Sequence, residues 1–116
     1  MRASIAVCVV ASVLTAGCGH HVSVPQLVRG VWGSDCKTPF VSFNEDSIHI
    51  YADNASYALK EVTFNGNDLH VKYENTTGAV VETYVKSGET LRIKSGTYNG
   101  VDTSWDKPPM SRCPSN

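Results

Sequence analysis

Residues 62–73 read VTFNGNDLHVKY, and this stretch decides the fold class. Apolar and polar side chains alternate on both sides of Asn65-Gly66, and an Asn-Gly pair between two alternating runs is among the strongest sequence indications of a β-hairpin. In the second run Leu69 and Val71 share one face of the strand and His70 lies on the other. We therefore expect a hairpin with one face in a hydrophobic core and one in water.

The same alternation, interrupted by turn residues, recurs over most of the chain. Strands are predicted at residues 28–32, 40–43, 47–51, 57–64, 69–73, 80–86 and 90–94. The apolar phase changes within residues 57–64, which predicts a bulge at Lys60-Glu61. The fold class is all-β: a single antiparallel meander of about seven to eight strands, closed or nearly closed into a barrel, because closure removes exposed strand edges. Pro25 allows one turn of helix before the first strand.

Length and charge limit the classes of protein. The chain has 116 residues and a net charge of −1, which fits one domain and lacks the basic excess of a nucleic-acid-binding protein. Hydrophobic residues make up 41% and charged residues 18%, so the composition is that of a globular protein rather than a disordered one.

The N-terminus has the pattern of a secretory signal peptide over residues 1–17, with Arg2 followed by an apolar run to Ala16. The run is too short to cross a membrane as a helix. Its end, LTAGC at residues 14–18, resembles the lipobox of bacterial lipoproteins, although Thr15 stands where that family prefers an aliphatic residue.

The resemblance implies that Cys18 is the lipidated residue, carrying acyl chains such as palmitate, and that residues 18–27 form a tether. With Gly19 next to the cysteine, it also implies an outer-membrane lipoprotein facing the periplasm. The alternative is ordinary cleavage near Ala16, which would leave a soluble periplasmic or secreted protein with a plain thiol at Cys18.

The four cysteines divide by role. Cys8 leaves with the signal peptide and Cys18 takes the lipid, so Cys36 and Cys113 remain in an oxidising compartment. We expect these two to form one disulfide. Two free thiols or a metal-binding pair are the alternatives.

The predicted domain, residues 28–116, carries a further resemblance. Gly30-Val31-Trp32 in the first strand is similar to the Gly-x-Trp signature of the calycin superfamily, which includes lipocalins and avidins. The resemblance implies a barrel with Trp32 at its closed end and a late arginine, here Arg112, over the indole ring. The long helix that follows the strands in lipocalins has no counterpart here.

The sequence contains no catalytic set, no phosphate-binding loop and no zinc spacing, so no enzyme activity, cofactor or metal is predicted. His49 and His70 fall on the predicted solvent faces of their strands, where they fit a metal pair only if those strands are close. His20-His21 is interpreted as polar linker.

Residues 95–109, SGTYNGVDTSWDKPP, are predicted to form a long loop, a kind of segment that is often functional. Candidate binding residues in it are Tyr98, Asp102, Trp105 and Asp106, since an aromatic residue on a polar loop is typical of a binding hot spot. The alternative is that Trp105 folds back over the mouth of the barrel.

These observations predict a lipid-anchored, non-catalytic binding module of the bacterial envelope, with the membrane and a protein or small molecule as partners. Inhibitor or immunity-type proteins are one sub-class of such modules. A structural outer-membrane lipoprotein and a small carrier of apolar ligands are the alternatives.

Overall fold

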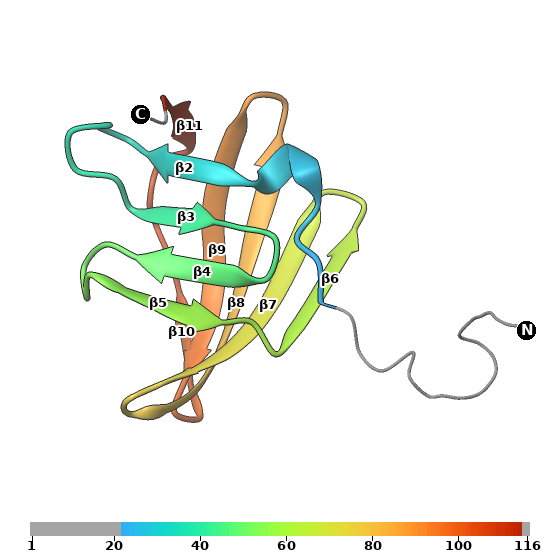
Figure 1. The fold of residues 1–116 in the computed structure, drawn as a ribbon, viewed down its shortest axis with the longest axis vertical. Coiled ribbons are helices and arrows are strands. Elements are labelled where there is room, and N and C mark those ends of the chain that lie inside the picture. The colour runs from blue at the N-terminus through green and yellow to red at the C-terminus, as the bar shows by residue number, and fades with distance from the viewer. Residues whose placement is uncertain (1–21, 115–116) are drawn as a thin grey trace, which may run out of the picture.

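A computed structural model describes residues 22–114 of the chain. The signal peptide, Cys18 and His20-His21 lie outside the described residues. The described part is all-β except for one 3-10 turn after Pro25, as the sequence predicts (Figure 1). Within that part, no helix is long and apolar enough to cross a membrane. The elements are η1 (Gln26–Val28), β2 (Gly30–Gly33), β3 (Val41–Phe43), β4 (Ser47–Ile50), β5 (Ala55–Ala58), β6 (Glu61–Asn65), β7 (Asp68–Asn75), β8 (Gly78–Ser87), β9 (Thr90–Tyr98), β10 (Val101–Ser104) and β11 (Met110–Cys113).

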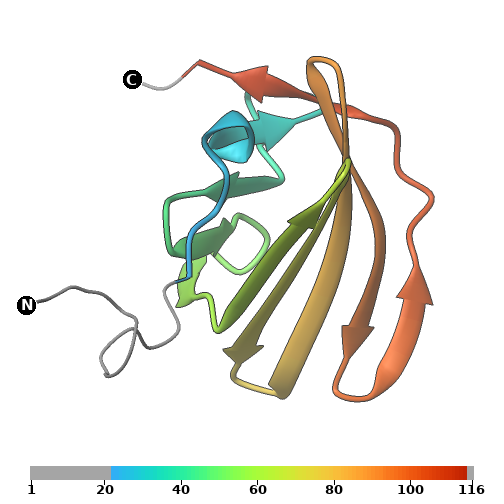
Figure 2. The ribbon, with the colours of Figure 1, turned by 90° about the vertical axis from the view of Figure 1, so that its right-hand side faces the viewer.

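The ten strands form one antiparallel sheet that curls into a half-barrel (Figures 1 and 2). The order of nine of them is β5-β4-β3-β2-β11-β9-β8-β7-β6. The tenth, β10, lies outside this order and pairs with β9. The sheet is open between β5 and β6, so the predictions of a closed or nearly closed barrel and of seven to eight strands are wrong. The antiparallel meander itself is confirmed.

The opening has a local cause at Leu59 and Lys60. The Leu59 amide donates at 2.9 Å to the carbonyl oxygen of Asp46, the residue directly before β4, whereas the Lys60 amide donates at 2.7 Å to the carbonyl oxygen of Lys72 on β7. The chain therefore changes pairing partner between two adjacent residues. The strand predicted over 57–64 is two strands, and the predicted bulge is a complete break.

The core lies on the concave face of the curled sheet, where the predicted inward side chains gather. Leu69 and Val71 are buried and His70 is exposed, in agreement with the alternation. The folded part also includes Val24, which is buried and whose amide donates to the Glu45 carbonyl at 2.7 Å. The largest fully buried side chains are Trp32, Tyr84, Phe43, Ile48, Leu69, Leu91, Ile93 and Met110.

Trp32 is fully buried in this core. Its Nε1 donates to the Val28 carbonyl at 2.8 Å, and the Arg112 guanidinium lies 4.4 Å from the ring centroid. Arg112 also donates to the carbonyl oxygens of Leu27 and Arg29. Gly30 has a φ of 121° and its missing side chain leaves room for the guanidinium, since a Cβ there would lie 2.7 Å from an Arg112 nitrogen. Gly30, Trp32 and Arg112 therefore form one packing unit.

The disulfide between Cys36 and Cys113 is present, with the Cα atoms 5.4 Å apart. It becomes possible because β11 pairs with β2, which places Cys113 opposite Val31. The first and last strands of the domain are neighbours, as the predicted closure of the meander implies.

Reduction of this disulfide should destabilise the domain strongly. The closed loop has a sequence separation of 77 residues, for which the chain-entropy relation gives about 4 kcal/mol. For a domain of this size that corresponds to a fall in Tm of about 15–30 °C. Calorimetry with and without reductant measures the change. A Cys36→Ala/Cys113→Ala variant should have the Tm of the reduced wild type, and reductant should not change it. Equal Tm values for the oxidised and reduced wild type would contradict the pairing.

Candidate functional site

The segment that was predicted to be a binding loop is mostly strand. β9 continues to Tyr98, a two-residue turn at Asn99-Gly100 follows, and β10 runs antiparallel to β9. Asn99 and Gly100 have φ values of 54° and 85°, as the tightest hairpin turns require. The prediction of a loop over residues 95–109 is wrong for residues 95–98 and 101–104. Figure 2 shows β10 at the outer side of β9, followed by the stretch that returns to β11.

The four candidate residues of this segment lie in different environments. Asp102 is exposed and accepts a hydrogen bond from the Thr97 hydroxyl at 2.8 Å, and Asp106 is exposed. Tyr98 and Trp105 are half-buried, and the indole Nε1 donates to the Tyr98 hydroxyl at 2.9 Å. Trp105 also packs edge-on against Phe40 at 6.0 Å between centroids. The two aromatic side chains are therefore part of the packing, and the two carboxylates face solvent.

Behind Tyr98 lies a buried carboxylate that the sequence analysis missed. Glu82 on β8 is only 5% exposed, and its carboxylate accepts hydrogen bonds from three tyrosine hydroxyl groups. Tyr73 and Tyr84 donate to Oε1 at 3.2 and 3.0 Å, and Tyr98 donates to Oε2 at 2.7 Å. The three tyrosines come from β7, β8 and β9. Trp105 donates in turn to the Tyr98 hydroxyl, so hydrogen bonds run from the buried Glu82 through Tyr98 to the half-buried Trp105.

Burial controls the protonation of this cluster. Desolvation raises the pKa of Glu82, and the hydrogen bonds from Tyr98, Tyr84 and Tyr73 oppose that rise by stabilising the carboxylate. Desolvation and the nearby Glu82 charge raise the pKa values of Tyr73 and Tyr84. The tyrosines thus stay protonated and act as donors, which suits a structural cluster that holds one buried acid.

Gly96 makes the Tyr98 contact possible. It lies opposite Glu82 in the β8–β9 register. The Tyr98 ring lies over the space that its missing side chain leaves, because a Cβ on Gly96 would come within 2.6 Å of the ring atom Cε2. A register shift between Thr83 and Tyr84 on β8 changes the phase of β9, so that Ile93 and then Gly96 are buried. The bulge and the glycine together place Tyr98 on the acid.

The two domain histidines lie apart, on β4 and β7. His49 Nδ1 is 2.8 Å from the Ser56 hydroxyl, and His70 Nδ1 is 2.9 Å from the Thr83 hydroxyl. Within residues 22–114, no group of three or more His, Cys, Asp or Glu side chains is arranged to hold a metal ion. Each histidine instead makes a cross-strand hydrogen bond to a hydroxyl group on the next strand.

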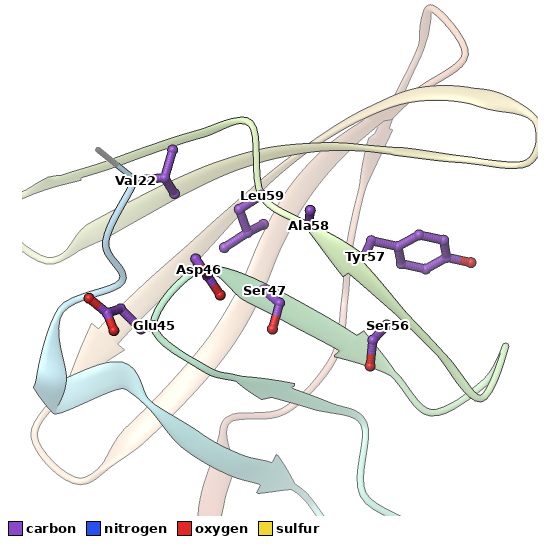
Figure 3. A pocket seen from close by; sticks show the side chains of 8 residues that line it. All are labelled: Val22, Glu45, Asp46, Ser47, Ser56, Tyr57, Ala58 and Leu59. Carbon is purple, nitrogen blue, oxygen red and sulfur yellow. The ribbon is translucent and has the colours of Figure 1, made fainter. Parts of the chain in front are cut away.

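A surface recess of about 520 Å³ lies where β5 ends and the N-terminal segment enters. Figure 3 shows Glu45 and Asp46, from the turn between β3 and β4, on one side of it and Leu59 with Val22 on the other. Ser47, Ser56, Tyr57 and Ala58 complete the lining. The recess combines carboxylates and hydroxyls with an apolar wall beside the start of the described chain.

A second recess, of about 310 Å³, lies on the outer face of β8, β9 and β10. It includes Asp102, the candidate residue that faces solvent beside Thr97. Its lining is otherwise mostly hydroxyl-bearing: Val81, Thr83, Ser95, Gly96, Thr97, Thr103 and Ser104.

Comparisons of the chain with protein-family models, with curated protein sequences and with solved structures found no match.

A Gly96→Ala substitution should displace Tyr98 from Glu82. We expect destabilisation of about 1–3 kcal/mol, since the added methyl group overpacks a close contact and leaves a buried acceptor with one donor fewer. Urea denaturation followed by Trp fluorescence measures it. Gly88→Ala is the matched control for loss of a glycine, because a Cβ at Gly88 has open space and only the positive φ of 56° is strained. An unchanged free energy of unfolding for Gly96→Ala would contradict the packing role of Gly96.

The stability of the domain should depend on pH through Glu82. Because its folded-state pKa is raised above the unfolded value, the contribution of Glu82 is fully present below about pH 4 and is lost as pH rises through the folded-state pKa. The free energy of unfolding of wild type minus that of Glu82→Gln should therefore fall between acid and neutral pH. Urea denaturation across that range measures it. The exposed Glu74 supplies the control Glu74→Gln, which should follow the wild-type curve; a pH-independent difference for Glu82→Gln would refute the expectation.

Proposed function

We propose that this protein is a lipid-anchored, non-catalytic binding module of a bacterial cell envelope. The observation that carries the proposal is the short apolar leader ending in LTAGC, directly before a small folded domain. Cys18 would carry the acyl chains, and the domain would present its outer surface to a ligand or partner. More than one acyl chain is needed for stable anchoring, which the lipoprotein modification supplies.

The disulfide supports an extracytoplasmic location. Cys36 is exposed and Cys113 is buried, and their bond ties the last strand to the loop after the first. Disulfides persist in oxidising compartments such as the periplasm and are rare in the cytosol. A structural bond of this kind agrees with export of the chain.

The arrangement of the aromatic residues supports a binding role on the outside of the fold. The concave face is occupied by large side chains such as Trp32 and Tyr84, which are fully buried. The half-buried Trp105, the exposed Asp102 and the outer recess all lie on or beside the β9–β10 hairpin. Rigid strands that present such groups make a preorganised surface, which reduces the entropy lost on binding.

A Cys18→Ser variant tests the anchor. The wild-type protein should pellet with membranes and incorporate radiolabelled palmitate, and the variant should do neither. Folding is checked by the disulfide, which should form in both proteins because Cys36 and Cys113 are unchanged. A Cys8→Ser variant is the matched control and should behave as wild type. Palmitate labelling that persists in Cys18→Ser, or a wild-type protein that stays soluble and unlabelled, would overturn the proposal.

A further inference from the structure

The outer face of the β6–β10 half of the sheet carries a row of hydroxyl groups that crosses five strands. The register aligns Thr63 on β6 with His70 on β7, His70 with Thr83 on β8, Thr83 with Ser95 on β9, and Ser95 with Ser104 on β10. Side chains at aligned positions of neighbouring antiparallel strands lie on the same face, about 5 Å apart. The row is a continuous polar strip with four hydroxyl groups and one imidazole.

A second row runs parallel to it, two residues along each strand. Its members on β8, β9 and β10 are Val81, Thr97 and Asp102. On β7 the row continues with Lys72, whose ammonium group lies 3.9 Å from the Glu61 carboxylate. Lys72 is the only cation of this row among the described residues, and it pairs with Glu61. Neither residue lines the recess.

The outer recess lies where the two rows cross β8, β9 and β10. Six of its lining residues form a grid of two rows by three strands: Thr83, Ser95 and Ser104 in the first row, and Val81, Thr97 and Asp102 in the second. Its volume of about 310 Å³ lies at the lower end of the range for small-molecule sites. The grid is thus a hollow the size of a small ligand rather than a flat sheet surface.

The hydrogen-bonding capacity of the grid is only partly used. The Thr83 hydroxyl is hydrogen-bonded to His70, and the Thr97 hydroxyl is hydrogen-bonded to Asp102. Ser95 and Ser104 make no side-chain hydrogen bond to another residue within 22–114. A serine hydroxyl both donates and accepts, and the Asp102 carboxylate accepts. The groups left over suit a ligand that offers several hydroxyl groups.

The charge of Asp102 and the apolar side chain of Val81 limit the class of ligand that the recess can bind. Within the described chain, no residue that lines the recess carries a positive charge, so phosphate, sulfate and carboxylate groups gain no ion pair and meet Asp102. Val81, 38% exposed, supplies an apolar patch between the polar groups. A neutral sugar combines hydroxyl groups with an apolar C–H face and fits this arrangement.

We propose that the outer recess of β8, β9 and β10 binds a neutral glycan, with Ser95, Ser104 and Asp102 as its hydrogen-bonding residues. This inference rests on the proposed function, because a binding module of the cell envelope faces glycan strands. Asp102 was a candidate residue from the sequence, whereas the two serines were identified by the strand register.

The test uses the full-length acylated protein in a detergent without a sugar headgroup, such as dodecylphosphocholine. Tetra-N-acetylchitotetraose is the neutral probe, and tetragalacturonate is the anionic probe of similar size. Amide chemical shifts are followed by NMR up to about 10 mM probe, which is enough to detect a millimolar Kd. We expect saturable shifts with the neutral probe that are centred on residues 81–83, 95–97 and 102–104, and none there with the anionic probe.

Substitutions assign the site. Ser95→Ala/Ser104→Ala and Asp102→Asn should each weaken binding of the neutral probe by about tenfold or more, which is the effect of losing one good hydrogen bond to the ligand. The matched control is Ser87→Ala/Ser111→Ala, which removes two exposed hydroxyl groups outside the recess and should bind as wild type. Amide spectra of all variants show whether each one is folded.

Three results would overturn the glycan site: no saturable shift with the neutral probe, shifts centred elsewhere, or tighter binding of tetragalacturonate. These results are separate from the outcome of the Cys18→Ser experiment. A chain that is lipidated but does not bind the probe refutes this inference alone. A chain that binds the probe in the grid without lipidation refutes the anchor and supports the glycan site.

Discussion

The two halves of this fold are joined by one strand of four residues. β2 to β5 form one antiparallel run and β6 to β10 another, and β11 lies between β2 and β9 with hydrogen bonds to both. A strand this short contributes few pairings. Two further interactions hold it: the Cys36–Cys113 disulfide and the Arg112 guanidinium over Trp32. The rest of the sheet depends on this seam, because the other connection between the halves is the corner at Leu59 and Lys60, where the chain changes pairing partner and β5 and β6 do not pair with each other.

The seam explains why Gly30, Trp32 and Arg112 occur together. Arg112 binds two carbonyl oxygens at the end of η1, and Trp32 binds a third, that of Val28. Carbonyl groups at the end of a short helical turn lack partners within the turn, and a guanidinium satisfies more than one of them. The N-terminal turn, the first strand and the last strand are therefore fixed by one cation and one indole ring.

Sequence periodicity predicted the parts of the fold that depend on local pattern. The hairpin at Asn65-Gly66 and the inward side of β7 are both present. The hairpin at Asn99-Gly100 carries the same dipeptide and was nevertheless missed, because alternation fails around it. The bulge near Lys94 changes the phase of β9, and Gly96 replaces an inward side chain that would have revealed the strand.

Glu82 could not be identified from the sequence for a different reason. Its position between Val80 and Tyr84 predicts that it faces inward, but a charged residue there gives no indication of its partners. The three hydroxyl donors are separated along the chain and meet only after β7, β8 and β9 have paired. Only the strand register brings together residues distant in sequence, and the same holds for Ser95 and Ser104 on the outer face.

Both faces of the β8–β9–β10 region therefore follow from one set of registers. The bulge between β8 and β9 that turns Gly96 and Tyr98 toward Glu82 also turns Ser95 and Thr97 outward, next to Ser104 and Asp102. The inner face fixes the geometry through a buried acid with three donors, which tolerates little displacement because an unpaired buried carboxylate is costly. The outer side chains contribute little to the core. Their identities can change without loss of the fold, while the spacing that a ligand would meet is held by the tyrosines on the opposite face.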